Sequence, residues 1–394
     1  MSVSQQDSAG TDVAPSSVTE TEQSITDPAA EGQPRRTRVA IVFGGRSSEH
    51  TISCATAGSV LAHIDRERYD VVPIGITRDG RLVLQADDPA PLALELMPEV
   101  TGGDAVQLPT SSGSREFTAT DASGAVRSLG HVDVVLPILH GRFGEDGTLQ
   151  GMLDLIDLPY AGNGVLASAV AMDKHFAKTV LEHAGIAVAP WMTVSRQEWA
   201  TDPEAVRARL AEFAMPVFVK PARAGSSVGV SRVASADAFD AAMELALAED
   251  TRALVEAGVS GREIEVGVLG GHGLDRARAS LPGEIVLDEG TFYDFDAKYR
   301  GLPTARTVCP ADLDDATIAA LQRTAVEAFE AIDGSGLARV DFFVSPEHGI
   351  VLNEVNTMPG FTSISMFPVV WEASGIAYGD LITELIELGL QAER

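Results

Sequence analysis

Runs of apolar residues mark the strands at the start of the chain. A continuous apolar run at residues 38–43 is interpreted as a buried strand, and a second run at 71–76 as the next strand. The stretch between them predicts a helix with a serine cap and with Glu49 in its first turn. This strand–helix–strand order is typical of a parallel α/β sheet. Such sheets bind ligands at the carboxyl ends of their strands, so G-G-R-S-S-E-H at residues 44–50 is a candidate site, with a plain tight turn as the alternative.

A third apolar strand is expected at residues 132–139. It ends in H-G-R-F-G-E-D-G, and an apolar-periodic helix follows at 148–156. A polar, glycine-rich segment at a strand exit again indicates a site, whereas a helix cap with solvated acids is the alternative. His140 stands at this exit, and both a ligand-binding role and a place in the core are open to it. The weakly patterned residues 81–130 are interpreted as a surface hairpin or loop insertion.

The middle of the chain carries a loop of small residues. The A-G-N-G stretch at residues 161–164 marks a domain boundary, and a helix is expected to run from there to about residue 184. The strand V-F-V-K-P-A then precedes R-A-G-S-S-V-G-V. A loop of this composition brings backbone N–H groups close to phosphate oxygens, and Lys220 and Arg223 beside it support that hypothesis over a plain hairpin turn. The P-loop pattern is absent.

Two acids and one irregular segment follow. The strands expected within residues 253–270 place Glu256 at a strand end and Glu263 at a strand start. Such acids either accept hydrogen bonds from an adenosine or face water. Residues 291–310 are aromatic and basic without a clean period, which is typical of a lid. Lys298 and Tyr299 are its candidates for ligand contact.

The segment 337–360 has the pattern of a β-hairpin. Two runs rich in Val, Phe, Ile and Leu flank S-P-E-H-G, and the second run ends in N-E-V-N-T-M-P-G. Strand alternation places Arg339 and Asp341 on one face, and Glu354 and Asn356 on one face. If these faces coincide, three oxygen donors and one guanidinium converge. Hard oxygen ligands without His or Cys suit Mg²⁺ between carboxylates and phosphates, whereas an edge hairpin with solvated acids is the alternative.

Composition limits the partners. A chain of 394 residues is expected to form two or three domains. Its net charge of -28 argues against a nucleic-acid partner, so any anionic ligand must be held by local cations. Two cysteines form neither a disulfide framework nor a zinc spacing, which indicates a reducing cytoplasm, and no apolar run is long enough to span a membrane. Residues 1–36 lack aromatic side chains and are expected to be disordered.

Seven motifs occur in a fixed order along the chain. They are G-G-R-S-S-E-H, H-G-R-F-G-E-D-G, M-D-K, V-K-P-A-R-A-G-S-S-V-G, F-Y-D-F-D-A-K-Y, R-V-D and N-E-V-N-T-M-P-G-F-T-S-I-S. In this order they resemble the D-alanine–D-alanine ligase family of the ATP-grasp superfamily over roughly residues 37–390. Two departures are visible, because Ala224 stands where many relatives have an acid and Arg262 where many have proline.

The resemblance implies an α/β fold of three-domain ATP-grasp architecture with an N-terminal parallel α/β domain. The ranges expected are a disordered extension at 1–36, an N-terminal substrate domain at 37–162 with an insertion at 81–130, a central ATP-grasp subdomain at 163–256, and a C-terminal subdomain with metal site and lid at 257–394. Because the family usually forms a homodimer, a cytoplasmic homodimer is expected here.

The implied reaction joins two D-alanine molecules with ATP through an acyl phosphate, releasing ADP and phosphate, for peptidoglycan synthesis. The alternatives are a ligase that takes D-lactate as its second substrate, or another ATP-grasp carboxylate–amine ligase. The Lys298–Tyr299 pair favours an amine, whereas Met366 sits where family specificity is tuned. A non-catalytic nucleotide-binding regulator predicts a lost metal ligand, and none of the three expected ligands is lost.

The resemblance also assigns roles to individual residues. Two Mg²⁺ ions, with Mn²⁺ as a substitute, are expected at Asp341, Glu354 and Asn356. The expected ATP contacts are Lys174, Lys220, Ser226, Ser227, Lys298, Glu256 and Glu263, the two glutamates on the adenosine.

The remaining implied roles concern the two amino acids. Glu49 pairs with the first ammonium, and Ser226 and Tyr299 link to Glu49 by hydrogen bonds. His140 lies near the first substrate, Ser365 holds the second carboxylate, and Arg339 and the N–H of Gly360 face the developing oxyanion.

Overall fold

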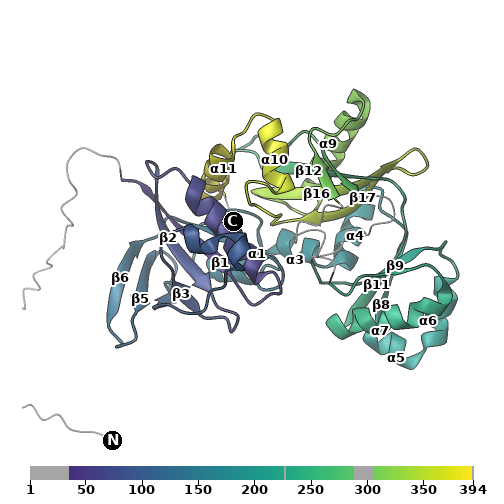
Figure 1. The fold of residues 1–394 in the computed structure, drawn as a ribbon, viewed down its shortest axis with the longest axis horizontal. Helices are drawn as coiled ribbons and strands as arrows, with labels where there is room; N and C mark the ends of the chain where they lie inside the picture. Colours follow the sequence, from purple (N-terminus) through teal and green to yellow (C-terminus); the bar gives the residue numbers. More distant parts are fainter. Residues whose placement is uncertain (1–34, 226–227, 288–304, 393–394) are drawn as a thin grey trace, which may run out of the picture. The chain divides into compact units, whose positions relative to one another are not determined.

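The structure is a computed structural model, which describes residues 35–225, 228–287 and 305–392 (Figure 1). Nearly all of the extension expected to be disordered, and most of the expected lid, lie outside these residues. Three β-sheets, each with helices packed against it, form the described chain from residue 36 onward.

The first sheet has a parallel centre. Its strand order is β6-β5-β4-β3-β2-β1-β7, and β1 (Thr37–Gly44) pairs in parallel with β2 (Tyr69–Ile76) and with β7 (Val134–Ile138). The apolar central residues of these strands are buried, which is why the sequence shows continuous apolar runs rather than alternation. Helix α1 (His50–His63) connects β1 to β2, and α2 (Thr148–Leu155) follows β7. The predicted parallel α/β unit is confirmed.

Residues 81–130 extend this sheet, so their interpretation as a surface hairpin or loop insertion was wrong in part. The antiparallel strands are β3 (Leu82–Leu84), β4 (Ala105–Gln107), β5 (Glu116–Thr120) and β6 (Val126–His131), with short 3₁₀ turns at Ala90–Leu92 and Leu94–Leu96. Only the β5–β6 pair is the expected hairpin. The strands are short and largely exposed, with Phe117 and Ala119 among the few buried side chains, and this leaves a weak pattern.

The second sheet is antiparallel, with the order β10-β9-β11-β8. Its strands are β8 (Trp191–Ser195), β9 (Val217–Pro221), β10 (Ser231–Val233) and β11 (Arg252–Ala257). Val217 and Val219 lie on the face that packs into an apolar cluster with the helices α5 (Arg196–Thr201), α6 (Pro203–Leu210) and α7 (Phe239–Glu249). Because side chains alternate, Lys220 of β9 is on the opposite face.

The third sheet contains the predicted hairpin. Its strands are β12 (Arg262–Leu269), β13 (Arg278–Ala279), β14 (Gly283–Leu287), β15 (Ala305–Val308), β16 (Leu337–Ser345) and β17 (Gly349–Asn356). Strand β16 pairs with β12 on one side and with β17 on the other, all antiparallel. Helices α9 (Asp315–Ala331) and α10 (Met366–Ala373) pack on this sheet (Figure 1). Strand β15 occupies part of the segment that was expected to be an irregular lid.

Two helices replace the single one expected up to residue 184. They are α3 (Val165–Met172) and α4 (Lys174–His183), and Asp173 between them has an extended backbone. The Asp173 carboxylate accepts the backbone N–H of His175 at 3.1 Å, so it caps α4 and starts a new helix. Helix α4 reaches the second sheet through His175, whose Nδ1 lies 3.0 Å from Thr193 Oγ1 of β8. Its other side packs with the third sheet through Leu181.

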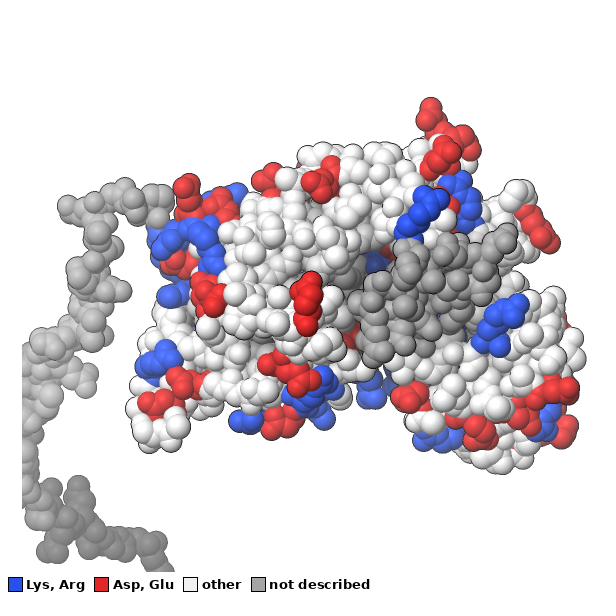
Figure 2. All heavy atoms as spheres, in the orientation of Figure 1, with Lys and Arg blue, Asp and Glu red and all other residues white. Residues whose placement is uncertain are grey.

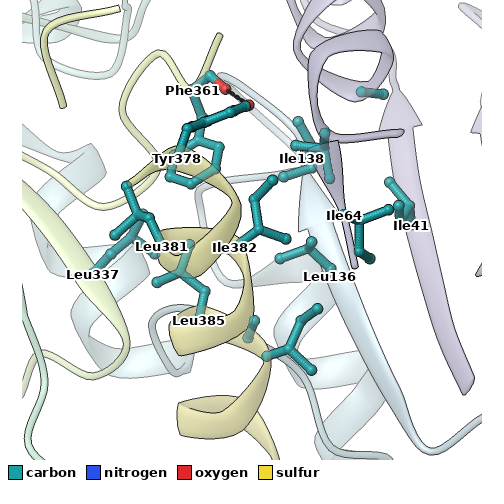
Figure 3. Packing of buried hydrophobic residues seen from close by; sticks show 14 of the residues in the cluster. Ile41, Ile64, Leu136, Ile138, Leu337, Phe361, Tyr378, Leu381, Ile382 and Leu385 are labelled. Carbon is teal, nitrogen blue, oxygen red and sulfur yellow. Dashed lines mark hydrogen bonds between the residues drawn. The ribbon is translucent and has the colours of Figure 1, made fainter. Parts of the chain in front are cut away.

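A buried apolar cluster joins the first sheet to the end of the hairpin (Figure 3). It includes α11 (Tyr378–Gln391), whose Leu385 belongs to the same buried cluster as Leu136 of β7 and Leu337 of β16. The hydroxyl of Tyr378 donates a hydrogen bond of 2.6 Å to the carbonyl oxygen of Phe361 (Figure 3). The strand ends of the first sheet and the end of the hairpin, which the sequence analysis singled out as candidate sites, therefore rest on one apolar cluster.

The surface mixes both signs of charge. On the face shown in Figure 2, acidic and basic side chains are interspersed, and the described residues form no continuous basic area there. Within the described part of the chain, no helix has the length and apolarity needed to cross a membrane.

Leu385→Ala tests the importance of the cluster around α11. Because Leu385 is fully buried, the free energy of unfolding should fall by about 2–5 kcal/mol through lost burial and an unfilled cavity. Leu274 is fully exposed, so Leu274→Ala is the matched control and should change stability by less than about 0.5 kcal/mol. Urea titration measures both, and equal effects of the two substitutions would contradict the packing described here.

Candidate active site

The β16–β17 hairpin brings its polar side chains to one spot. Arg339 is directly opposite Asn356, and Asp341 is directly opposite Glu354. The Arg339 guanidinium donates to both Asp341 carboxylate oxygens at 2.7 Å, and Asn356 Nδ2 donates to Asp341 Oδ2 at 3.0 Å. A register shift follows directly after Asp341, where the strand locally bends. The faces predicted to coincide do coincide.

Glu265 of β12 belongs to the same cluster, although the sequence analysis did not single it out. It is directly opposite Asp341 on the neighbouring strand, and its Oε2 lies 3.0 Å from Arg339 Nε. Burial opposes the charge of Arg339, but Asp341 and Glu265 outweigh it and raise the pKa of Arg339 well above its usual value. The alternation in R-E-I-E, which puts Glu263 and Glu265 on one face of β12, was the available signal.

The donor set at the hairpin fits a hard divalent cation. Asp341 and Glu354 supply carboxylate oxygens, and Asn356 supplies an amide oxygen, so each ligand is of the type that Mg²⁺ prefers. Among the residues that the structure describes, no cluster of three or more His, Cys, Asp or Glu could hold a metal by itself. Two acids and one amide therefore leave the remaining coordination positions to water and to a ligand's own oxygens.

Asn163 explains how the two ends of the hairpin are held together. Its buried amide donates to the carbonyl oxygens of Leu337, at 2.6 Å, and Thr357, at 3.1 Å. Its Oδ1 accepts the N–H of Ser335 at 3.0 Å. One side chain thus satisfies backbone groups at the start of β16 and just after β17, which fixes the register of the pair.

A second charged cluster lies on the face of the second sheet that carries Lys220, opposite its apolar cluster. Glu256 of β11 forms ion pairs with Lys220 of β9 through one carboxylate oxygen and with Lys178 of α4 through the other. Burial by itself would raise the pKa of Glu256, but Lys220 and Lys178 together outweigh it and lower that pKa. The sequence analysis gave no role to Lys178. It is four residues after Lys174 and therefore on the same helix face, which was the available signal.

The glycine-containing loop is held at its base by a hydrogen bond and an ion pair. Lys174 Nζ donates to the carbonyl oxygen of Ala224 at 2.8 Å. The Arg223 guanidinium makes two contacts with Asp250, and the pairing raises the pKa of Arg223. Arg223 therefore anchors the loop to the sheet in this structure. Its position beside the loop had suggested a contact with phosphate instead. Ser226 and Ser227 at the tip of the loop lie outside the described residues.

Glu49 lies where the first sheet meets this loop. It is the N-cap of α1 rather than part of the first turn, because the helix begins at His50. It is only 8% exposed, and glycines line its carboxylate. A methyl group added to Gly141 would lie 2.8 Å from Glu49 Oε2, and one added to Gly225 would lie 3.0 Å from it. The glycines thus let the buried carboxylate of Glu49, at the N-cap of α1, approach the backbone of two other loops.

His140 and Glu145 surround this carboxylate on the side of β7. His140 is buried, and its Nδ1 lies 3.0 Å from the carbonyl oxygen of Met358, just past the hairpin. Burial lowers the pKa of His140, although the nearby Glu49 opposes that shift. Glu145 accepts the N–H of Gly141, and burial together with Glu49 raises the pKa of Glu145 to about 8. Glu145 is thus not the solvated helix-cap acid considered as an alternative.

Gly360 and Ser365 form a turn that leads into α10. Ser365 is the N-cap residue of this helix, and its Oγ is 3.2 Å from the N–H of Thr362 and 2.8 Å from Thr362 Oγ1. A methyl group on Gly360 would lie 3.2 Å from Ser365 Oγ, so the glycine backbone and the serine hydroxyl are close neighbours. Ser365 is half-buried.

In the described part of the chain, the predicted residues gather at the hairpin, around Glu256 and around Glu49. Glu263 is on β12 of the third sheet, opposite Phe343 and on the face that carries Glu265, whereas Glu256 is on β11 of the second sheet. Lys298 and Tyr299 lie outside the described residues.

Comparisons with known proteins agree over nearly the whole described chain. The family model for the N-terminus of D-ala D-ala ligase matches residues 38–163, and the model for its C-terminus matches residues 180–387. The D-alanine–D-alanine ligase of Paenarthrobacter aurescens is 51% identical over 360 residues, covering 90% of this chain and 95% of that protein. The one from Kocuria rhizophila is 52% identical over 370 residues, covering 92% and 97%.

Solved structures give the same result. The VanG D-Ala:D-Ser ligase from Enterococcus faecalis has a TM-score of 0.78 and 34% identity, with 90% of this chain and 99% of that chain covered. The D-alanine-D-alanine ligase from Coxiella burnetii has a TM-score of 0.75 and 35% identity, with 90% and 94% covered. This chain belongs to the D-alanine–D-alanine ligase family and has its ATP-grasp fold.

Proposed function

We propose that this protein uses ATP to join two D-alanine molecules into D-alanyl-D-alanine, releasing ADP and phosphate, for peptidoglycan synthesis in the cytoplasm. The observation that carries the proposal is the convergence of Arg339, Asp341 and Asn356 on the hairpin, with Glu354 directly opposite Asp341. Relatives with about half of their residues identical over most of the chain carry the name of this activity.

The chemistry of the reaction explains why the protein can catalyse it mainly by placing charged groups. A carboxylate is a poor acyl donor, because its leaving group would be oxide. A carboxylate oxygen of the first D-alanine attacks the γ-phosphorus of ATP, and ADP leaves. The amine nitrogen of the second D-alanine then attacks the acyl carbon, phosphate leaves, and the amine loses a proton. Both steps build negative charge on oxygen, so the protein contributes mainly by positioning and by neutralising charge.

The hairpin residues suit a metal-assisted phosphoryl transfer. Asp341, Glu354 and Asn356 would hold two Mg²⁺ ions, with Mn²⁺ as a substitute, because all three offer hard oxygen ligands on one face. When bound, such ions neutralise charge on the ATP phosphates. Arg339 and the N–H of Gly360 would face the oxyanion, and donors of this kind are worth ~3–4 kcal/mol each in other enzymes.

The cations near the glycine loop suit the phosphates of ATP. Lys174 and Lys220 stand on either side of the loop, and Ser226, Ser227 and Lys298 would complete the contacts. Glu256 and Glu263 would accept hydrogen bonds from the adenosine. Since Lys220 is already paired with Glu256, its ammonium is held close to the nucleotide position before ATP arrives.

The surroundings of Glu49 suit the first amino acid. Glu49 would pair with its ammonium, and His140 would lie beside it. Burial and the nearby Glu49 raise the pKa of Glu145 to about 8, which makes Glu145 the poorer partner for an ammonium at neutral pH. Ser226 and Tyr299 would form hydrogen bonds to Glu49, and Ser365 would hold the carboxylate of the second amino acid.

We also propose the division into an N-terminal domain at 37–162, a central subdomain at 163–256 and a C-terminal subdomain at 257–394. Each range contains nearly all strands of one sheet, which supports these boundaries. A homodimer is proposed on the basis of the family alone.

The proposed function predicts a substrate preference. Incubation with ATP, Mg²⁺ and D-alanine should release equal amounts of phosphate and D-alanyl-D-alanine, measured by coupled phosphate assay and mass spectrometry. Competition with D-lactate at neutral pH tests the depsipeptide alternative, and D-serine is included because a solved relative carries that substrate in its name. Phosphate release with no dipeptide, beside an active relative as control, would disprove the proposal.

Asp341→Asn should raise the Mg²⁺ concentration needed for half-maximal turnover. The loss of one ligand charge should raise this Mg²⁺ concentration by at least about tenfold, because loss of a residue that only supports a metal ligand already weakens metal binding by about that factor. Asp333→Asn is the matched control, because Asp333 is exposed in the turn after α9. Chelation with EDTA should abolish turnover of the wild-type protein, and Mg²⁺ or Mn²⁺ should restore it. An unchanged Mg²⁺ requirement in Asp341→Asn would exclude this residue as a ligand.

Glu145→Gln should change how stability depends on pH. The pKa of Glu145 is about 8 in the folded chain but about 4.5 in an unfolded one, so the folded state alone keeps the proton between these values. The stabilisation from Glu145 is thus full below pH 4.5 and falls as pH rises towards 8, by at most about 1.4 kcal/mol per pH unit. Glu145→Gln should remove this slope, whereas the exposed control Glu212→Gln should keep it. Parallel curves for both variants would show that Glu145 is ionised in the folded chain.

A further inference from the structure

Lysine is rare in this chain. Only four of the 29 lysine and arginine residues are lysines, at positions 174, 178, 220 and 298. Three of them already have proposed contacts with the phosphates of ATP. The fourth, Lys178, lies in the same region of the structure and has no role in the proposed reaction. Among the residues that the structure describes, the exposed ion pairs that involve lysine or arginine are made by arginine, so a buried lysine calls for a reason specific to its place.

Lys178 is buried more completely than its neighbours. The exposed fractions of the side chains are 3% for Lys178, 5% for Glu256 and 14% for Lys220. Lys178 pairs with Oε1 of Glu256, and Lys220 pairs with Oε2. Burial and the nearby Lys220 lower the pKa of Lys178, while Glu256, and Glu182 on the next helical turn, act against that shift. Two ammonium groups thus share one buried carboxylate.

One ammonium is enough to neutralise one carboxylate, so the second has a cost without an evident gain in the ligand-free protein. Taking a charge out of water is expensive, and a buried ion pair rarely stabilises a fold beyond what apolar packing would give. The cost is explained if the more exposed partner, Lys220, leaves the carboxylate when ATP arrives. Glu256 would then be a buried charge without a counter-ion unless Lys178 stays.

The position of Lys178 suits a partner that stays. Helix α4 is packed between the second and third sheets and is capped by Asp173, whose carboxylate pairs with Arg252 of β11. Lys178 is in the middle of this helix, one turn after Lys174. Lys220, by contrast, is next to the glycine-containing loop at the end of β9, where its long side chain can swing towards a phosphate.

We propose that Lys178 is a positioning residue for the nucleotide. It remains bound to Oε1 of Glu256 and keeps that carboxylate ionised and oriented, so that Lys220 can exchange Oε2 of Glu256 for a phosphate oxygen of ATP. The freed Oε2 then accepts a hydrogen bond from the adenosine. Lys178 acts through Glu256 and does not touch the ligand. The inference rests on the proposed function, since it requires ATP as the ligand of this site.

The test compares nucleotide binding in Lys178→Met, Lys178→Arg and the wild-type protein by isothermal titration calorimetry with a non-hydrolysable ATP analogue and Mg²⁺. Lys178→Met should weaken binding by at least about tenfold, because the move of Lys220 then leaves a bare buried carboxylate. Lys178→Arg keeps the charge and should restore most of the affinity. Arg323→Met removes one positive charge from the exposed face of α9 and should bind like wild type, which controls for net charge.

A double-mutant cycle separates positioning from a merely structural role. Once Glu256→Gln has removed the charge, adding Lys178→Met should weaken nucleotide binding by less than about threefold, since the two residues act as one unit. The KM for D-alanine should stay within about twofold in Lys178→Met, while the KM for ATP rises. If Lys178→Met alone does not fold, the double variant Lys178→Met/Glu256→Gln should fold, because it also lacks the buried carboxylate. Its nucleotide affinity should match that of Glu256→Gln.

Two results would overturn the inference: nucleotide affinity of Lys178→Met within twofold of wild type, or effects of Lys178→Met and Glu256→Gln that simply add. Either result, with a wild-type protein that binds ATP and makes dipeptide in the same assays, rejects the role of Lys178 alone. A wild-type protein that binds no ATP would reject the proposed function instead.

Discussion

The ion pair between Arg339 and Asp341 is the interaction on which the described site depends. It joins a cation and a proposed metal ligand on one strand, and Asn356 and Glu265 bind the same pair from the strands on either side. A chain with a net charge of -28 repels a triphosphate unless its cations are concentrated in one place. Here those cations are buried against carboxylates, and the Lys220–Glu256 pair repeats the arrangement on the second sheet.

Such pairs favour a defined geometry more than they favour stability. Because desolvating two charges costs about as much as their attraction returns, each pair is ready to exchange its carboxylate for a phosphate or a metal. The backbone around them is fixed by other means. Asn163 bonds both ends of the hairpin, His140 reaches Met358 beyond it, and Tyr378 binds Phe361 within the apolar cluster. Charged groups can therefore change partners on a frame that keeps its shape.

The sequence predicted the helices and strands better than it predicted where a helix is interrupted or which side chains pair across the fold. The hairpin and its converging residues followed from strand alternation, which fixes the face of each side chain. The break at Asp173 was missed because a capping carboxylate in the middle of an apolar-periodic stretch leaves the period nearly intact. The strands within 81–130 were missed because short, half-exposed strands have few apolar positions. Lys178 and Glu265 were given no role because their partners are on other elements, and only the fold brings them together.

The most direct test of the account is a crystal structure of the protein with Mn²⁺ and a non-hydrolysable ATP analogue, analysed by anomalous scattering from the metal. The account predicts anomalous peaks about 2.0–2.3 Å from oxygens of Asp341, Glu354 and Asn356. It also predicts that Lys220 binds a phosphate oxygen in that complex, with Arg339 facing the terminal phosphate. Metal peaks away from the hairpin, with Asp341 still bound only to Arg339 and Asn356 beneath a bound nucleotide, would contradict it.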